Sequence, residues 1–286
     1  MRILVTGAGG QLGHDLALAF GGHETLLADR AILDVTDAAA ARALVDSFRP
    51  DAVIHGAAWT DVDGCERDPE RARLVNVEGT RNVAAAARDA FVVVVSTDYV
   101  FDGMLGRAYV EDDVPNPLQV YGQTKLDAER AALDVGARVA IARTAWLYGA
   151  RVANGEPAGN FVTAILRAAS RGTLDVVDDQ IGSPTWTGDL ARALVSLVER
   201  ATPGIFHVAS RGAVSRADFA RAVLRGAGKD PALVRACSTA EASPRPAARP
   251  KNAPLEGRAW AAAGFEPLPV WMRALSVALP DILATR

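Results

Sequence analysis

The chain has 286 residues, of which 50% are hydrophobic and 23% charged, and a formal net charge of -3 at pH 7. This length and composition predict an ordinary globular core with a smaller lobe beside it. Because a net charge of this sign provides no broad positive field, nucleic acid and anionic membrane surfaces are not expected as partners.

The ends of the chain and its cysteines give no sign of export. Met1 and Arg2 lead directly into an apolar strand and then glycines, without the apolar region and cleavage site of a signal peptide. No apolar stretch approaches the roughly 18 residues that a membrane-spanning helix needs. Cys65 and Cys237 lack metal-ligand spacing and cannot form a disulfide framework. We therefore expect a cytoplasmic protein that does not bind membranes.

The N-terminus predicts a strand over residues 2–6 and a helix over residues 14–20, joined by a glycine-rich turn. Its glycines have the spacing GxxGxxG at Gly7, Gly10 and Gly13. They permit a tight turn, close approach of the backbone to a pyrophosphate, and close contact of helix with sheet. Amides at the helix start would face the phosphates. A glycine motif alone is weak evidence, but this position between strand and helix indicates a dinucleotide site.

The second predicted strand, residues 24–28, ends where adenosine ribose recognition is expected. Asp29 would favour a free 2′-hydroxyl and Arg30 a 2′-phosphate, so the choice between NADH and NADPH stays open. A solvated turn of mixed charge is the equally weighted alternative. Asp34, a little further on, is a candidate for contact with the adenine amino group.

The third predicted strand, residues 52–55, is followed by small residues. Ala57 and Ala58 would let a cofactor lie against the backbone, whereas His55 is expected to be a packed residue and not a catalyst. Residues 70–90 then predict one long alanine-rich helix. Within it, Asn76 either faces solvent or supports a polar network under the site.

A fourth strand and the helix after it carry the most informative side chains. The apolar residues 91–95 predict a strand buried on both faces, which places Thr97 at its carboxyl end, where open α/β sheets bind ligands. After a polar loop, Tyr121 and Lys125 are four residues apart in a segment with helical spacing, so they share one helix face. A hydroxyl, a phenol and a cation could therefore converge on one carbonyl group.

These three side chains suit the reduction of a ketone by a nicotinamide cofactor. The pKa of a free tyrosine is near 10, and the positive charges of Lys125 and an oxidised nicotinamide are expected to lower it. Tyr121 could then protonate the alkoxide as hydride reaches the carbonyl carbon, a contribution of roughly 10²–10⁴ in rate. Lys125 would also bind the nicotinamide ribose, and Thr97 would position the carbonyl oxygen. The pattern YxxxK is common by chance, so its weight comes from the glycine motif upstream.

Alternating strands and helices up to a fifth strand at residues 139–144 predict the fold. Right-handed βαβ units build a doubly wound parallel sheet of the Rossmann type. We assign residues 1–150 to an NAD(P)-binding domain and residues 151–286 to a smaller, mixed, loop-rich substrate lobe with strands and helices that return to the sheet. More than half of the 15 prolines lie from residue 231 onward, which predicts no long regular element there.

Several runs resemble the extended short-chain dehydrogenase/reductase superfamily and, within it, the dTDP-4-dehydrorhamnose reductase family. Together they span most of the chain, roughly residues 2 to 275. The matching runs are Gly10-Gln11-Leu12-Gly13, Ser96-Thr97-Asp98-Tyr99-Val100-Phe101-Asp102-Gly103, Pro117-Leu118 ahead of Tyr121-Gly122, Asp179-Gln180 with Gly182 and Pro184-Thr185, and Arg249-Pro250. One departure is His55-Gly56 where the family commonly has Asn-Ala.

The resemblance implies reduction of the C4 ketone of dTDP-4-dehydro-L-rhamnose by NADPH or NADH, with Thr97, Tyr121 and Lys125 as the catalytic set. The expected cofactor contacts are Gly7, Gly10, Gln11, Leu12, Asp29, Arg30, Asp34, Val35, Ala57, Ala58, Tyr121 and Lys125. The expected contacts with the dTDP-sugar are Thr97, Trp146, Asn160, Phe161 and Gln180, although Trp146 could equally belong to the core. Some family members are homodimers bridged by Mg²⁺ through an acid of the first helix, where Asp15 stands here.

Two alternatives are considered beside plain reduction. Sugar dehydratases of this superfamily resemble one another in having Asp then Glu after the catalytic threonine, whereas here Thr97 is followed by Asp98 and Tyr99. Loss of the second carboxylate favours a reductase, and a related nucleotide-sugar ketoreductase or epimerase stays open. A non-catalytic NAD(P)-binding regulatory subunit is the other alternative, and the intact Thr97, Tyr121 and Lys125 argue against it.

Overall fold

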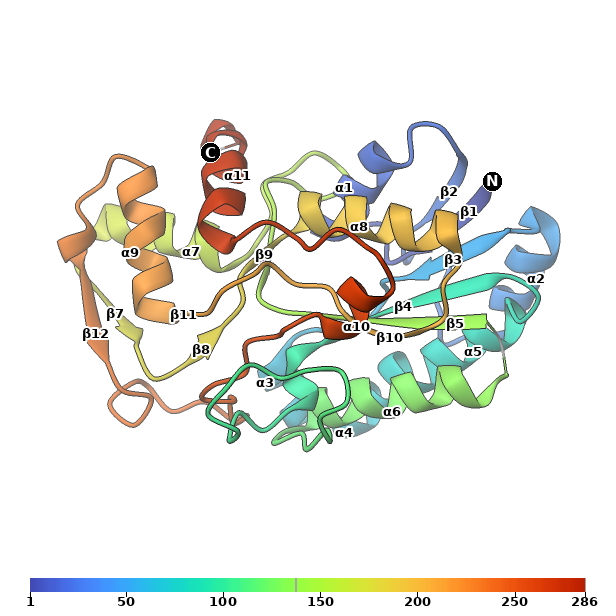
Figure 1. Ribbon diagram of the computed structural model, residues 1–286, viewed down its shortest axis with the longest axis horizontal. Helices are drawn as coiled ribbons and strands as arrows, with labels where there is room; N and C mark the ends of the chain where they lie inside the picture. Colours follow the sequence, from blue (N-terminus) through green and yellow to red (C-terminus); the bar gives the residue numbers. More distant parts are fainter. Residues whose placement is uncertain (137, 286) are drawn as a thin grey trace.

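The computed structural model, which describes residues 1–136 and 138–285, is built around a six-stranded parallel sheet (Figure 1). The strand order is β10-β5-β4-β3-β1-β2. The strands are β1 (Arg2–Thr6), β2 (Glu24–Ala28), β3 (Ala52–His55), β4 (Phe91–Thr97), β5 (Arg138–Thr144) and β10 (Gly204–His207). The order reverses between β1 and β3, the kind of switch point at which open α/β sheets bind ligands. The predicted doubly wound sheet is confirmed.

Register brings the carboxyl ends of the central strands level with one another. Thr6 pairs with His55 across β1 and β3, and Thr97 pairs with Thr144 across β4 and β5. β4 extends two residues beyond the predicted end at Val95. Its side chains are almost all buried, as expected for a parallel strand covered on both faces.

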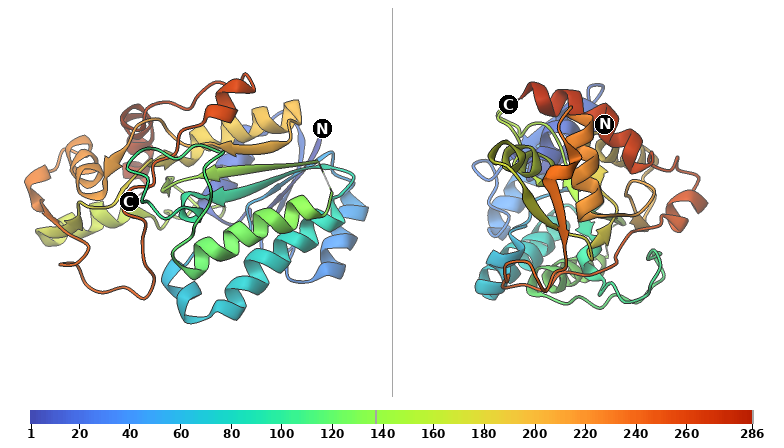
Figure 2. Two further views of the ribbon diagram at one scale, coloured as in Figure 1. Left: turned by 60° about the horizontal axis from the view of Figure 1, so that its bottom comes forward. Right: turned by 90° about the vertical axis from the view of Figure 1, so that its left-hand side faces the viewer.

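Helices cover both faces of the sheet, and each layer has its own apolar core (Figures 1 and 2). One layer contains α1 (Gln11–Ala19) and α8 (Thr187–Arg200), and the other contains α2 (Ala38–Phe48), α5 (Gly79–Ala86) and α6 (Val120–Asp134). α1 begins three residues earlier than predicted, because the last glycines of the turn already have helical hydrogen bonding. α2 begins where the Asp37 carboxylate accepts two backbone N–H groups, and such a cap stabilises a helix by about 1 kcal/mol.

The prediction of one uniform helix over residues 70–90 was wrong. Two short helices, α3 (Val62–Arg67) and α4 (Pro69–Arg73), precede a π-helical turn, η1 (Leu74–Glu78), and α5 then ends at Ala86. Asn76 lies in the π turn and is fully buried. Its amide bonds both backbone groups of Trp59 and the Thr124 hydroxyl of α6, which confirms the polar network under the site. π-helical turns are frequent at functional sites.

The C-terminal half adds a third cluster of buried side chains at one end of the molecule, on the left in Figure 1. The further strands and helices of this half are β6 (Leu147–Tyr148), α7 (Phe161–Ala168), β7 (Leu174–Val177), β8 (Ile181–Gly182), β9 (Thr185–Trp186), β11 (Val214–Ser215), α9 (Arg216–Gly226), β12 (Val234–Cys237), α10 (Arg258–Ala262) and α11 (Trp271–Ala284). Of these, α10 packs against the core of the α1 and α8 layer. The prediction that this proline-rich region has no long regular element fails for α11. Burial of Leu275, Leu279 and Ile282 outweighs the hydrogen bond that Pro280 removes.

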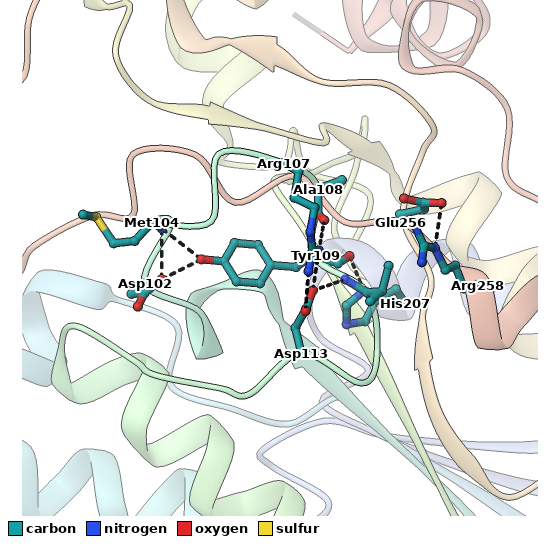
Figure 3. A network of polar contacts seen from close by, with 10 residues as sticks. Asp102, Met104, Arg107, Ala108, Tyr109, Asp113, His207, Glu256 and Arg258 are labelled. Carbon is teal, nitrogen blue, oxygen red and sulfur yellow. Dashed lines mark hydrogen bonds and ion pairs between the residues drawn. The ribbon is translucent and has the colours of Figure 1, made fainter.

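The loop between β4 and α6 is fastened to β10 by a polar network (Figure 3). The Tyr109 hydroxyl donates to Asp102 at 2.6 Å, and Arg107 makes a bidentate ion pair with Asp113 at 2.7 Å. His207 of β10 contacts the Tyr109 carbonyl oxygen at 3.0 Å through Nδ1. The contact with His207 therefore ties this loop to β10.

Cys65 and Cys237 are both free. Throughout residues 1–136 and 138–285, no helix is both long and apolar enough to cross a membrane.

Candidate active site

A cavity of about 640 Å³ opens at the carboxyl ends of the central strands. It begins at the glycine turn, passes the ends of β1, β3 and β4, and reaches α6 and the segment after β5. Its lining includes Gly7, Gly10, Gln11, Leu12, Arg30, Asp34, Val35, Ala57, Ala58, Thr97, Tyr121, Lys125 and Trp146. The structure therefore brings together most of the residues selected from the sequence. Asp29, Asn160, Phe161 and Gln180 do not line this cavity.

The glycine turn leaves space that a side chain would fill. Gly7 has a φ of 70°, and a Cβ there would lie 2.5 Å from the Ala57 amide nitrogen. At Gly10, which caps α1 without a side-chain hydrogen bond, the nearest atom to such a Cβ is 3.6 Å away. The backbone is thus open at the start of α1, where free N–H groups attract phosphates. These residues fit a dinucleotide.

Replacing Gly7 by Ala is expected to weaken NADPH binding at least about tenfold, which corresponds to about 1.4 kcal/mol. The methyl group would collide with the exit of β3, and φ would remain in the left-handed region that disfavours alanine. Cofactor titration by fluorescence measures the effect. Gly9→Ala is the matched control, because its Cβ would meet Asp29 at an ordinary 3.5 Å. Equal affinities of the two variants would contradict the expectation.

At the adenosine end, Arg30 and Asp34 face the cavity and Asp29 does not. The Asp29 carboxylate accepts the backbone N–H groups of Ala31 and Ile32 at 2.9 and 3.1 Å, so it stabilises its own turn. Arg30 has an 81% exposed side chain and lies 3.6 Å from Asp34. Hydrogen bonds from Thr36 lower the pKa of Asp34.

Thr97, Tyr121 and Lys125 all line this cavity. The Thr97 hydroxyl donates to Asp98 at 3.1 Å and accepts from the Tyr99 amide at 3.2 Å. The Lys125 ammonium donates to the Val95 carbonyl oxygen of β4 at 2.8 Å. Burial raises the pKa of Asp98, beside Thr97, to about 7.

The pKa of Tyr121 differs from the sequence expectation. Burial raises it above its ordinary value, and the Thr97 hydroxyl opposes this only in part. Lys125 directs its ammonium to a backbone carbonyl, and burial lowers its own pKa to about 8, against the raising effect of Glu129. The expectation that Lys125 lowers the pKa of Tyr121 therefore does not hold for the polypeptide itself, because desolvation is the larger effect. Tyr121 is protonated at neutral pH, as a general acid must be.

Trp146 closes the far side of the cavity. It has a φ of 46°, and strained backbone of this kind clusters at ligand sites. Its ring is covered by the Arg216 guanidinium, 3.5 Å from the ring centroid. A Cβ on Gly182 would collide with the same ring. Gly182 and Arg216 thus hold Trp146 from two sides.

The other three predicted substrate residues are engaged elsewhere. Asn160 caps α7 and donates to the Gly149 carbonyl oxygen at 2.8 Å and to Gln11 at 3.1 Å. Phe161 stacks on Phe219 with ring centroids 5.6 Å apart, and Gln180 donates to Thr239 at 3.1 Å. Of the three, Asn160 contacts a residue of the cavity lining, through Gln11.

Sequence reasoning missed a group of arginines around Tyr99. Both Arg216 and Arg249 lower the pKa of the Tyr99 phenol against the larger raising effect of burial. Arg249 is in turn fixed by a bidentate ion pair with Asp63 at 2.6 and 3.0 Å. Arg249 is marked only by the family run Arg249-Pro250, and no local pattern marks Arg216. The start of α9, which carries Arg216, and the loop after β12, which carries Arg249, come together only in the fold.

His55 is packed, as predicted. Its Nδ1 contacts Thr6 at 2.7 Å and its Nε2 contacts Thr80 at 3.0 Å, and burial lowers its pKa to about 3. Asp15 is partly buried, and burial raises its pKa. Over residues 1–136 and 138–285, no group of three or more His, Cys, Asp or Glu side chains could hold a metal ion.

Comparison with known proteins identifies the family. The model of the family described as RmlD substrate binding domain matches residues 1–283. The chain belongs to this family. The chain is 43% identical to a dTDP-4-dehydrorhamnose reductase of Mycolicibacterium smegmatis, over 99% of this chain and 86% of that protein. A dTDP-4-keto-6-deoxy-D-glucose reductase of Streptomyces niveus is 42% identical, over 98% of this chain and 96% of that protein.

A solved RmlD-type structure gives the same result for the fold. The dTDP-4-dehydrorhamnose reductase of Bacillus anthracis, crystallised in complex with NADP, has a TM-score of 0.92 and 34% identity, with 98% of this chain and 99% of that chain covered. The family resemblance seen in the sequence is therefore confirmed, and with it the class of NAD(P)H-dependent oxidoreductase.

Proposed function

We propose that this chain reduces the C4 ketone of dTDP-4-dehydro-L-rhamnose to dTDP-L-rhamnose with a hydride from NADPH or NADH. The observation that carries the proposal is that Thr97, Tyr121 and Lys125 line the same cavity as the glycine turn. The names of the relatives, both of which are reductases of dTDP-linked keto sugars, support this substrate class.

Each group of residues in the cavity has a separate role in this reaction. The glycine turn and the first amides of α1 hold the cofactor diphosphate. The nicotinamide, when bound, supplies the hydride. Thr97 orients the ketone oxygen, and Tyr121 gives its phenolic proton to that oxygen as hydride reaches C4, so the ketone becomes a secondary alcohol. Lys125, whose ammonium donates to the Val95 carbonyl oxygen, lines the same cavity and would bind the nicotinamide ribose.

Residues 1–150 serve in this proposal as the cofactor domain and residues 151–286 as the substrate lobe. Trp146 and Arg216 support the sugar-nucleotide end of the cavity, since one offers an aromatic ring and the other a half-buried cation. Contacts of Asn160, Phe161 and Gln180 with substrate remain a prediction. A homodimer also remains a prediction, whereas the Mg²⁺ ion suggested at Asp15 has no support among the described side chains.

NADPH is the proposed preferred cofactor. Arg30 faces the cavity with an exposed guanidinium that suits a 2′-phosphate, while the Asp29 carboxylate is taken up by its own turn. The NADP complex of the Bacillus anthracis reductase supports the same choice.

The test is to follow the absorbance of the reduced cofactor with dTDP-4-dehydrorhamnose and with dTDP-4-keto-6-deoxy-D-glucose. We expect consumption of NADPH with the first keto sugar. If NADPH is consumed only with dTDP-4-keto-6-deoxy-D-glucose, that keto sugar is the substrate and the proposed one is wrong. If the cofactor binds but neither keto sugar is reduced, the regulatory alternative is supported.

The pH profile of kcat/KM is expected to fall as pH rises through about 8, where Lys125 loses its proton. Tyr121 keeps its proton across this range because burial raises its pKa. Initial rates between pH 6 and 10 measure the profile. Lys125→Arg is the control, since a guanidinium does not titrate there and its alkaline limb should disappear. Persistence of the limb in that variant would assign it to another group.

A further inference from the structure

A buried ion pair lies directly behind the catalytic lysine. Arg143 of β5 donates through Nε and Nη2 to both carboxylate oxygens of Glu129 on α6, at 3.0 and 2.7 Å. Each side chain is only 3% exposed. In the part of the chain that the structure describes, no other ion pair has both side chains so deeply buried.

The geometry links this pair to Lys125 through β4. Lys125 and Glu129 are one helical turn apart on the same face of α6. They bind consecutive residues of β4: the Lys125 ammonium donates to the Val95 carbonyl oxygen at 2.8 Å, and the Ser96 hydroxyl donates to Glu129. Ser96 precedes Thr97, so the same carboxylate also supports the end of the strand that carries Thr97.

Stability alone gives a weak reason for such a pair. Two charges removed from water cost several kcal/mol of desolvation each, and apolar replacements of similar volume are often neutral or stabilising. The Lys125 ammonium is also desolvated, because Lys125 is 3% exposed, and desolvation disfavours the protonated form that its role requires. A carboxylate fixed one helical turn away stabilises the ammonium form.

We propose that Glu129 is a positioning residue of the reductase site: held by Arg143 and Ser96, its carboxylate is the buried counter-charge of Lys125 and fixes the end of β4. The proposal rests on the proposed function only in giving Lys125 a catalytic role. Glu129 does not line the cavity, so it acts through Lys125 and not on the substrate.

No other negative charge among the described residues takes this place. Burial lowers the pKa of Lys125 to about 8, and the Glu129 carboxylate is the neighbour that raises it. The remaining titratable or charged groups around this part of the site are His55 on β3, Arg143 on β5, Tyr121 on α6 and Asp98 after β4. Neutral His55 and protonated Tyr121 contribute no charge, and Asp98 acts on Tyr121.

The test measures the titration of Lys125 directly by ¹³C NMR of lysine-labelled protein. The chain has only three lysines, Lys125, Lys229 and Lys251, so assignment is simple. In Glu129→Gln/Arg143→Met, which removes both charges, the midpoint is expected to move down by at least about one pH unit. The alkaline limb of kcat/KM should move by the same amount. If the Glu129–Arg143 pair has only a structural role, the double variant can be less active, but neither the NMR midpoint nor the alkaline limb would move.

Arg107→Met/Asp113→Asn is the matched control, because it removes an ion pair of the β4–α6 loop and is expected to leave the midpoint unchanged (Figure 3). Should the first variant not fold, Glu129→Asp withdraws the charge by one methylene and is expected to lower the midpoint by a smaller amount. An unchanged midpoint in a folded Glu129 variant overturns the proposal. Absence of reductase activity in the wild type would overturn the proposed function and leave the titration result standing.

Discussion

Tyr121→Phe is expected to lower kcat for the keto sugar by roughly 10²–10⁴, the usual contribution of a positioned acid. The substitution removes only the phenolic hydroxyl and keeps a ring that is edge-on to Tyr99 at 6.0 Å. Because burial raises the pKa of Tyr121, the wild-type enzyme has this proton at every pH at which Lys125 is charged. The loss should therefore appear in kcat across the whole range and not as a displaced pH profile.

Stopped-flow and steady-state measurements with NADPH separate chemistry from binding in this variant. Affinity for NADPH should stay within a few-fold, since the glycine turn is untouched. Tyr109→Phe is the matched control, because its hydroxyl bonds Asp102 in the loop shown in Figure 3 and should leave kcat unaltered. A Tyr121→Phe enzyme with near wild-type kcat would assign the acid to another group, and Asp98, which accepts from the Thr97 hydroxyl, would be the first candidate.

Local patterns predicted the fold well because they report local physics. The apolar runs of β1, β3 and β4 are buried in a parallel sheet, and the glycine turn between β1 and α1 has the close approaches that its glycines permit. The Tyr121 and Lys125 pair could be placed from helical spacing alone. In each case the decisive contacts lie within a few residues or within one βαβ unit.

What the sequence could not provide depends on contacts between distant segments. Arg216 covers Trp146, 70 residues away, and Arg249 pairs with Asp63, so neither contact has a local pattern. The direction of the Tyr121 pKa also required the structure, because burial outweighs the neighbouring cation. The π turn at Asn76 escaped notice for the same reason, as its amide is satisfied by Trp59 and Thr124 from other elements.

Arg143→Met is expected to reduce the free energy of unfolding by about 3–5 kcal/mol, the usual cost of leaving one member of a buried ion pair without its partner. Glu129 would keep only the Ser96 hydroxyl, at a position where its side chain is 3% exposed. The double variant Glu129→Gln/Arg143→Met should be destabilised much less, because no unpaired charge remains. Urea unfolding followed by circular dichroism gives the three free energies.

Arg107→Met is the control for loss of an arginine as such, since the Arg107 side chain is 52% exposed and ion pairs open to water contribute at most about 1 kcal/mol. If the single Arg143 variant were no less stable than the double variant, Glu129 would take up a proton once its partner is lost. The counter-charge of Lys125 would then be absent in that variant as well, and the Lys125 midpoint should fall in it too. The two measurements therefore test the same carboxylate independently. The free energies of unfolding report the cost of leaving the Glu129 carboxylate without Arg143, and the Lys125 titration reports how far that charge raises the pKa of the lysine.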